Sequence, residues 1–302
     1  MTKMTRRKLL ATAAAVPAVS IPGWAAAPML GPSQARFRRF ALGEFEVTTL
    51  LAGTAVRDKP QSMFGMNVSE EEFNAVSEAA RLPIDKAKFF FTPTIVNTGS
   101  DLVLFDTGLS GESITETLSE AGYAPDMVTK VVLTHMHGDH IGGLMTEGAP
   151  TFPNANYITA TPEFDAWSKM ENDRFESNVA PLADKMTFIE DGATGFGGHT
   201  AIAAYGHTPG HMIHRIESAG QAIVLIADLA NHYVWSLAYP DWEVRFDMDK
   251  QAAAQSRRRV LDMLAAEQLP FVGYHMPWPA TGFVEKRGDG FAYVPTSYQL
   301  SL

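Results

Sequence analysis

The chain of 302 residues contains no cysteine. Disulfides, thiolate metal sites and cysteine nucleophiles are therefore excluded, and any metal ion has to be held by imidazole and carboxylate groups. The chain also lacks an excess of positive charge, because 24 basic residues face 34 acidic ones and the net charge is −10. This balance argues against nucleic acid as a partner. The one basic run, residues 257–259, is interpreted as a solvated face of a helix.

Long apolar runs are missing as well. After the N-terminus no stretch reaches the roughly 18 apolar residues of a transmembrane helix, so no stable membrane insertion is expected for residues 28–302. The first 27 residues differ, because basic residues precede a mild apolar run and the small-residue pattern AAA at 25–27. The basic residues are Lys3, Arg6, Arg7 and Lys8.

This N-terminal pattern is typical of an export signal, and Arg6-Arg7 followed by Leu9-Leu10 resembles a twin-arginine signal. We expect residues 1–27 to direct export to the periplasm, with an uncleaved membrane tether as the alternative. The remaining 20 basic and 34 acidic residues give residues 28–302 a net charge of −14.

Strand-like and helix-like segments are interspersed through residues 28–302 and predict one α/β domain of the α+β type. Strands are predicted at 45–51, 94–97, 102–105, 130–133, 156–159, 200–205, 212–217, 222–227 and 270–274. Helices are predicted at 67–80, 112–121, 162–170, 172–184 and 250–267. Two mixed sheets with helices outside would bury the apolar faces of these elements.

Histidine is scarce but concentrated. The chain has nine histidines, and three of them stand with an aspartate in THMHGDHIGG, residues 134–143. His135 and His137 point the same way in an extended chain, and Gly138 permits a bend that turns Asp139 and His140 toward a second position. The stretch leaves the strand predicted at 130–133, and loops at strand ends commonly carry sites. The spacing predicts two adjacent metal ions.

Two ions need more ligands, and three later segments offer them just past predicted strands. YGHTPGH contains His207, VLIADLA contains Asp228 and FVGYHMP contains His275. Strand-end side chains of this kind can gather at one edge of a sandwich. His211 is interpreted as structural, holding the loop at 209–210, and the remaining histidines carry no functional signal: His199, His214 and His232.

Together these motifs resemble the pattern of the metallo-β-lactamase-fold hydrolases over roughly residues 40–300. The resemblance implies an αββα sandwich of two mixed β-sheets with outer helices. His135, His137 and His207 resemble the ligands of one metal, and Asp139, His140 and His275 resemble those of the other. Asp228 resembles the bridging carboxylate. Asp106, in LFDTG, resembles an acid that orients a ligand histidine in this fold.

Differences from the motifs of related proteins indicate which group of the metallo-β-lactamase-fold hydrolases this chain resembles. His137 stands where flavodiiron-type proteins have Glu, and Asp228 stands where true β-lactamases of the fold usually have Cys or Ser. The segments LGEFEVTTLLAGT and HMPWPATGFVEKRGDGFAYVPTSYQL resemble the methyl parathion hydrolase-like group, whose relatives open lactones, acyl-homoserine lactones included, or cleave aryl esters. One lactonase subgroup has a Tyr where this chain has Asn231, so that tyrosine's role is left open, with Tyr233 as a substitute.

We therefore predict a binuclear hydrolase with two divalent ions, Zn²⁺ first among them, and manganese, cobalt or iron as alternatives. A hydroxide bridging the metals would attack a neutral ester or lactone, with Asp139 and Asp228 as catalytic carboxylates. The negative charge and the lack of lysine flanking the motifs favour fairly apolar, neutral substrates, with phosphotriesters as a side activity.

The substrate pocket is predicted from aromatic residues near the motifs. The candidates are Trp167, Phe175, Tyr233 and Trp278, and the run at 89–91 precedes a predicted strand. The main alternative function is an iron-dependent oxygenase or oxidoreductase of the same fold, and β-lactamase-like activity is another. The sequence leaves a homodimer open.

Overall fold

The computed structural model describes residues 33–297. The chain from Ala35 onward forms one compact unit. The predicted export signal at 1–27 lies outside the described residues. In the described part, no helix combines the length and the apolar character needed to cross a bilayer.

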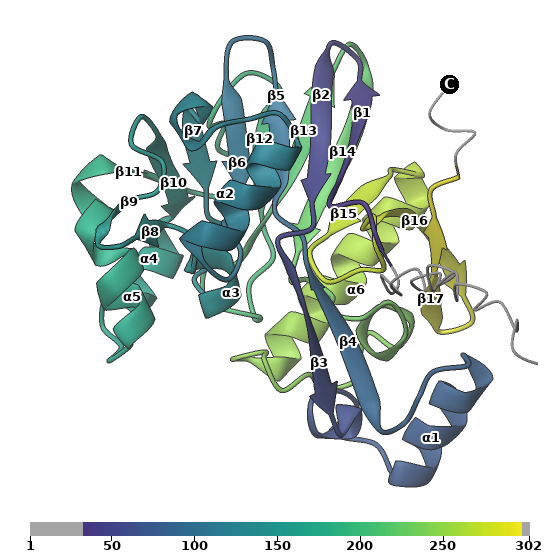
Figure 1. The fold of residues 1–302 in the computed structure, drawn as a ribbon. Helices are drawn as coiled ribbons and strands as arrows, with labels where there is room; N and C mark the ends of the chain where they lie inside the picture. Colours follow the sequence, from purple (N-terminus) through teal and green to yellow (C-terminus); the bar gives the residue numbers. More distant parts are fainter. Residues whose placement is uncertain (1–32, 298–302) are drawn as a thin grey trace, which may run out of the picture. The chain divides into compact units, whose positions relative to one another are not determined.

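Two mixed β-sheets face each other and form the centre of the fold (Figure 1). The first sheet runs in the order β1 Phe37–Leu42, β2 Phe45–Leu50, β5 Thr94–Asn97, β6 Leu102–Phe105, β7 Lys130–Val132, β10 Asn156–Ala160 and β11 Met186–Ile189. The second runs in the order β12 His199–Ala203, β13 Met212–Ser218, β14 Gln221–Ala227, β15 Phe271–Gly273, β16 Thr281–Arg287 and β17 Gly290–Pro295. The expected pair of mixed sheets is confirmed.

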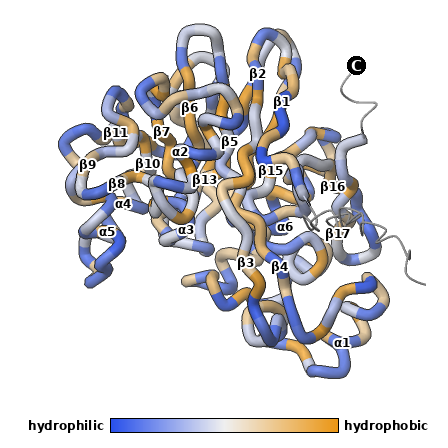
Figure 2. Tube along the Cα trace, viewed as in Figure 1, coloured by the Kyte–Doolittle hydropathy of each residue, from blue (hydrophilic) through white to orange (hydrophobic). Residues whose placement is uncertain are grey.

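The main core lies between these sheets. Val96 and Val103 of the first sheet and Ile213 and Val224 of the second are buried in one cluster. Such β-branched residues fit a pleated sheet surface, and each buried side chain of this size contributes about 1.5–3 kcal/mol. Figure 2 shows the hydrophobic residues concentrated along the strands, whereas the helix α5 is largely hydrophilic.

Helices cover the outer faces and complete the layers. They are α2 Gly111–Glu120, α3 Gly138–Ile141, α4 Thr161–Trp167, α5 Asp173–Asn178 and α6 Lys250–Glu267. Ile114 of α2 and Phe175 of α5 join a second core on the outer face of the first sheet, while α6 packs against β16 of the second. The arrangement confirms the αββα sandwich expected from the resemblance.

A two-stranded ribbon leaves the sandwich and leads to the helix α1 (Figure 1). It consists of β3 Gly53–Asp58 and β4 Lys86–Phe91, with α1 Glu70–Ala79 between them in the chain. Ser69 caps α1 by accepting a hydrogen bond from the Glu72 amide at 3.1 Å. The ribbon itself was not predicted, and the run at 89–91 lies inside β4 rather than before a strand.

Short elements complete the described chain. They are η2 Pro60–Ser62, η3 Pro125–Met127, β8 Met145–Thr146, β9 Ala149–Pro150, η4 Ala180–Lys185 and the π-helical segment η5 Tyr233–Ala238. η5 packs with α1 and β4 in a third core that contains Phe73, Phe89 and Trp235.

The basic run at 257–259 corrects one sequence expectation. Arg257 is fully buried, so it does not belong to a solvated helix face, whereas Arg259, two positions further on, is exposed. The inward face of α6 carries Ala253, Arg257, Val260, Leu261 and Leu264. This spacing of three and four residues is that of one helix stripe, so Arg257 points into the fold with the apolar residues.

Candidate metal centre

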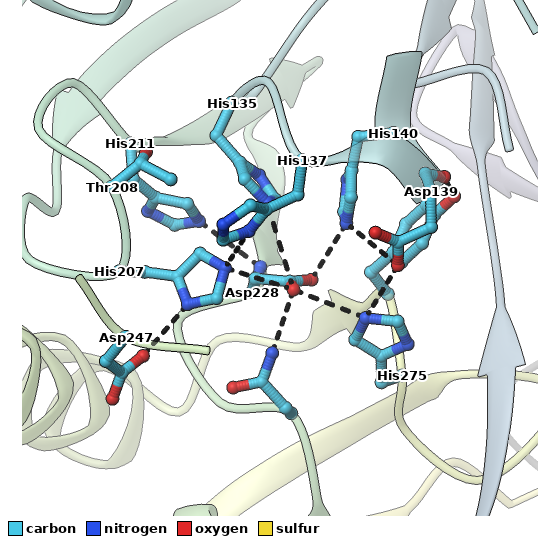
Figure 3. Close-up of polar contacts among 12 residues, drawn as sticks. His135, His137, Asp139, His140, His207, Thr208, His211, Asp228, Asp247 and His275 are labelled. Carbon is cyan, nitrogen blue, oxygen red and sulfur yellow. Dashed lines mark hydrogen bonds and ion pairs between the residues drawn. The ribbon is translucent and has the colours of Figure 1, made fainter. Parts of the chain in front are cut away.

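The seven candidate ligands converge at one edge of the sandwich (Figure 3). His135 and His137 follow β7, and Asp139 and His140 belong to the short helix α3. His207, Asp228 and His275 follow β12, β14 and β15 respectively. The carboxyl ends of these strands therefore supply every candidate ligand, as the motif order predicts.

The first group contains His135, His137, His207 and Asp228, whose ligand atoms all lie within 4.8 Å of one another. His137 Nδ1 is 2.9 Å from His207 Nε2 and 3.1 Å from His135 Nε2. Three ring nitrogens and one carboxylate at these separations form a donor set that suits zinc and similar divalent ions.

The second group contains Asp139, His140 and His275. Asp139 Oδ2 lies 3.6 Å from His140 Nε2 and 3.4 Å from His275 Nε2. The Asp139 side chain is 25% exposed, whereas the two histidine side chains are buried, so Asp139 is the carboxylate that solvent and a substrate can reach.

Asp228 lies between the two groups. Its Oδ1 is 3.2 Å from His140 Nε2, and its Oδ2 is 3.3 Å from both His207 Nε2 and His275 Nε2. Within residues 33–297, His140 Nε2 and Asp228 Oδ1 are buried atoms without a hydrogen-bond partner. Buried polar atoms of this kind cost about 1–3 kcal/mol each when unsatisfied. Two divalent cations, one in each group, would satisfy them, so the residues fit a binuclear centre.

Three ligand histidines are oriented through their Nδ1 atoms, which leaves Nε2 facing the centre. His140 Nδ1 contacts Asp106 Oδ2 at 2.8 Å, and His275 Nδ1 contacts the Phe90 carbonyl at 2.7 Å. His207 Nδ1 contacts Asp247 Oδ1 at 2.9 Å. Acceptors in these positions set the tautomer and raise the basicity of the ring nitrogen that binds metal. Asp106 thus lies where the resemblance implies.

The carboxylates of the site change the pKa values of the ligand histidines. Burial alone lowers the pKa of His207, but its hydrogen bonds to Asp228 and Asp247 outweigh burial and raise the pKa to about 9. Burial and the neighbouring His207 hold the pKa of His137 down at about 3. The carboxylates are therefore balanced partly by protonated histidine before any cation binds. Cations compete with those protons, which makes metal affinity depend on pH.

Asp247 is itself held by Arg257 of α6. Both terminal nitrogens of the guanidinium lie 3.1 Å from Asp247 Oδ2, and the arginine also donates to the carbonyls of Leu229 and Pro240. The buried Arg257 therefore bonds both Asp247, which contacts His207, and Leu229, which follows Asp228. This pair explains why α6 carries a charge on its inward stripe.

Glu163 of α4 joins two of the ligand loops. Its Oε1 accepts from the Met136 amide at 2.8 Å and from Trp167 Nε1 at 2.7 Å. Its Oε2 accepts from the Gly210 amide at 2.8 Å and from Thr208 Oγ1 at 2.7 Å. The fully buried carboxylate therefore ties the loop of His135 and His137 to the loop of His207.

Three more side chains fix the ligands from behind. Tyr274 donates to the Asp139 carbonyl at 2.5 Å and stacks on His140, with ring centroids 3.9 Å apart. Asn231 Nδ2 donates to Asp228 Oδ2 at 2.8 Å. His211 Nδ1 bonds the Ala204 carbonyl and its Nε2 accepts from the Asp228 amide, so it is structural, as expected, and serves the bridging position as well as its own loop.

A cavity of about 270 Å³ opens beside the ligands His137, Asp139, Asp228 and His275. Its other walls are Ala55 and Arg57 of β3, Phe89 and Phe91 of β4, Leu109, Gly138 and Phe246. Most of this surface is apolar, so it can bind an acyl chain or an aromatic ring next to the candidate metals.

The four aromatic residues predicted to form the pocket do not line this cavity. Trp167 is buried with its ring edge-on to His137, at 5.6 Å between centroids, and is hydrogen-bonded to Glu163. Phe175 belongs to the core under α5, Tyr233 stacks on His232, and Trp278 precedes Pro279 outside the lining residues. The cavity instead takes its aromatic residues from β4 and from Phe246.

Residues 92–271 match the family model of the metallo-beta-lactamase superfamily. The chain belongs to this superfamily. A curated relative is the atrochrysone carboxyl ACP thioesterase of Passalora fulva, 32% identical over 143 residues, which are 44% of this chain and 37% of the relative. The chain spans about two fifths of the length of the curated relatives it matches.

Solved structures of the superfamily cover far more of the chain. AidC, a dizinc quorum-quenching lactonase solved with a product, N-hexanoyl-L-homoserine, is 26% identical with a TM-score of 0.80, covering 87% of this chain and 98% of AidC. The hydrolase AbOPH is 22% identical with a TM-score of 0.80, covering 88% and 99% of the two chains, and shows the shared fold. Family match and fold place the chain in the metallo-beta-lactamase superfamily, and its two ligand groups supply donors that suit a pair of divalent cations.

The sequence did not predict several residues that support the candidate ligands. Asp247, Glu163 and Tyr274 lie outside the histidine motifs and meet the ligands only in the folded chain. Arg257 did leave a signal, because it falls on the apolar stripe of α6. Arg57 stands on a ribbon that was not predicted, so the cation in the cavity wall was missed as well.

Proposed function

We propose that this protein is a binuclear metallohydrolase that cleaves lactones and carboxylic esters, with Zn²⁺ as the native metal. The observation that carries the proposal is the position of Asp228, with Oδ1 near His140 and Oδ2 near His207 and His275. A carboxylate whose oxygens lie 3.2–3.3 Å from nitrogen donors of both groups is a ligand that two adjacent cations can share. When bound, such a pair of cations supplies Lewis acidity and lowers the pKa of water to about 7.

The chain's own residues then bind and orient the substrate. Phe89, Phe91 and Phe246 offer an apolar wall for an acyl chain or ring, next to the ligands that face the reacting carbonyl. The cavity admits a small molecule and excludes a folded partner. An apolar wall beside a polar reaction centre favours substrates that combine a carbonyl with a hydrocarbon part.

Asp139 is placed to move the proton. It is the more exposed of the two carboxylates, at 25% against 4% for Asp228, and it lies on the cavity wall. Burial works against ionisation, but His140 and His275 hold the pKa of Asp139 at about 2. It is therefore ionised at neutral pH, and its carboxylate can accept a hydrogen bond from the attacking water and relay that water's proton to the leaving alkoxide, a far stronger base, without itself staying protonated.

Similar proteins support an acyl substrate. The relative from Passalora fulva is a thioesterase, and AidC is a lactonase whose product contains an acyl chain. Thioesters, esters and lactones share an acyl carbon that is attacked by water. We propose phosphotriesters as a slower side activity, because they present a neutral but already tetrahedral centre to the same residues.

The test is a substrate panel measured on metal-analysed protein. We expect acyl-homoserine lactones and aryl esters to be hydrolysed with higher kcat/KM than phosphotriesters, and phosphomonoesters to be hydrolysed far more slowly. Activity should be lost with a chelator and restored by Zn²⁺. Asp139→Asn should lower kcat strongly, whereas Asp126→Asn, at an exposed acid, should leave kcat unchanged.

The alternative is an iron-dependent oxygenase of the same fold. A preparation that holds one iron per chain, consumes oxygen and leaves the ester and lactone panel untouched would establish that alternative and overturn the hydrolase. Efficient phosphomonoester hydrolysis would overturn the substrate class while leaving the metal centre in place.

A further inference from the structure

The ribbon β3–β4 presents one face to the cavity. Its cross-strand pairs are Gly53 with Phe91, Ala55 with Phe89 and Arg57 with Ala87. Residues directly opposite in an antiparallel pair share a face, so these six lie on the same side. In the first two pairs a small residue of β3 lies opposite a phenylalanine of β4. In the third pair the large residue, Arg57, is on β3 and the small one, Ala87, is on β4.

This face runs outward from the candidate metal ligands. The His275 ring meets Phe91 and Phe89 edge-on, at 5.5 and 5.7 Å between centroids. Because a strand rises about 3.4 Å per residue, Arg57 lies about 7 Å beyond the pair of Ala55 and Phe89 and about 14 Å beyond the pair of Gly53 and Phe91. Along the cavity the order is therefore metal ligands, aromatic rings, guanidinium.

Arg57 has no hydrogen-bond or ion-pair partner for its guanidinium among residues 33–297. Its neighbour Asp58 points to the opposite face of the ribbon, as does Lys86, which pairs with Asp58. The remaining lining residues at this end are Ala55, Phe89 and Phe246. A guanidinium beside apolar walls presents a planar fork of donors that matches a carboxylate in two parallel hydrogen bonds.

We propose that Arg57 is a specificity-determining residue that binds a carboxylate at the far end of the substrate. The inference rests on the proposed ester and lactone hydrolysis and narrows its substrate class. The substrate is amphipathic, with a scissile carbonyl at the metal ligands, an apolar segment along Phe89 and Phe91, and an anionic end at Arg57. This differs from the neutral substrate expected from the sequence, because the net charge of −10 says nothing about a single cation in the cavity wall.

Matched esters test the proposal. One aryl ester carries an acyl chain that ends in a carboxylate, the second ends in a methyl group at equal length, and the third has the carboxylate capped as its methyl ester. We expect the protein to prefer the carboxylate over both neutral esters by at least about tenfold in kcat/KM, through KM, since a charge-assisted hydrogen bond contributes more than a neutral one. The preference should fall as salt is added.

Variants assign the preference to Arg57. Arg57→Ala should abolish it, and Arg57→Glu should reverse it in favour of an ester that ends in an ammonium group. Lys86→Ala is the matched control, because Lys86 is an exposed cation of the same ribbon on its other face, and it should keep the full preference. The proposal would be overturned if the ratio of kcat/KM between the carboxylate ester and the neutral esters were the same in the original protein and in Arg57→Ala. It would also be overturned if the capped ester had the same kcat/KM as the carboxylate ester in the original protein.

Binding of a non-hydrolysed analogue separates this proposal from the proposed function. The monoamide of the same dicarboxylic acid, titrated calorimetrically into metal-loaded protein, should bind at least about tenfold more weakly to Arg57→Ala. If that difference is present but no ester or lactone is turned over, the hydrolase proposal fails and the carboxylate site stands. If all esters are turned over and the difference is absent, the hydrolase stands and the role of Arg57 fails.

Discussion

Asp247 Oδ1 lies 2.9 Å from His207 Nδ1, so a carboxylate 40 residues away in the chain determines which ring nitrogen of His207 faces the metal centre. Both side chains are almost fully buried, at 0% and 2% exposure. The contact therefore persists without competition from solvent, and it links the start of α6 to the ligand loop after β12.

Asp247→Asn should weaken metal binding. The amide oxygen can still accept the Nδ1 proton, but the negative charge that makes Nε2 a stronger donor is gone. Outer acids of this kind typically contribute 10- to 100-fold to metal affinity. Chelator competition should show that loss for one of two ions, while Asp241→Asn, at an exposed ion pair, keeps both affinities. Unchanged affinity in Asp247→Asn would contradict the assigned role.

Two adjacent arginines of α6 should differ sharply in their contribution to stability. Arg257→Met removes the guanidinium from the buried Asp247 carboxylate and leaves His207 as its charged partner, and breaking a buried pair costs about 3–5 kcal/mol. Arg258→Met breaks a pair whose side chains are 41% and 59% exposed, which costs less than about 1 kcal/mol. Urea unfolding of both variants measures the difference, and equal midpoints would show that the buried pair contributes no more than the surface pair.

Glu163→Gln should destabilise the protein although it preserves size. Each carboxylate oxygen of Glu163 accepts one backbone amide, from Met136 and from Gly210. An amide side chain has one oxygen, so one of these buried N–H groups would face an NH₂ group, at a cost of about 1–3 kcal/mol. We expect this loss in urea unfolding together with weaker metal retention. Glu176→Gln, on the exposed surface of α5, should match the original protein in both measurements.

Acid should destabilise the fold through a histidine outside the two ligand groups. Burial lowers the pKa of His199 to about 4, below the value of about 6.5 for an unfolded chain. Between these values the unfolded state binds more protons, so stability is complete above pH 6.5 and falls as the pH drops toward 4, by up to about 1.4 kcal/mol per pH unit.

His199→Gln tests this pH dependence, because glutamine can accept the Gly195 amide but does not titrate. The metal ligands are the same in both proteins, so the difference between their stability-against-pH curves isolates His199 and its neighbour His214. We expect a shallower curve for the variant between pH 4 and 6.5. Superimposable curves would mean that His199 does not titrate on unfolding.

The sequence predicts most of the sandwich and all residues that form the two ligand groups, for local reasons. His135 to His140 lie within six positions, and each later candidate lies within four residues of the end of a strand. A strand end leaves little freedom in where the next side chain lies, so the order of motifs is enough to bring these residues together.

The residues that support and surround the ligands could not be found in the same way. Asp247 reaches His207 only because the start of α6 packs against the loop after β12, where the amides of Met248 and Asp249 bond the carbonyls of His207 and Gly206. The cavity wall depends on the ribbon, where three consecutive phenylalanines conceal the alternation of exposed and buried residues in β4. Such contacts depend on tertiary packing rather than on local pattern.

Metal content measured by mass spectrometry on matched variants tests the central claim most directly. The account predicts two divalent ions per chain in the original protein and the loss of one ion in His137→Ala and in Asp139→Ala. Asp228→Asn should weaken both ions together, because its carboxylate lies beside nitrogen donors of both ligand groups. A single ion in the original protein, or an Asp228→Asn variant that loses one ion and holds the other at normal affinity, would contradict the bridged binuclear centre.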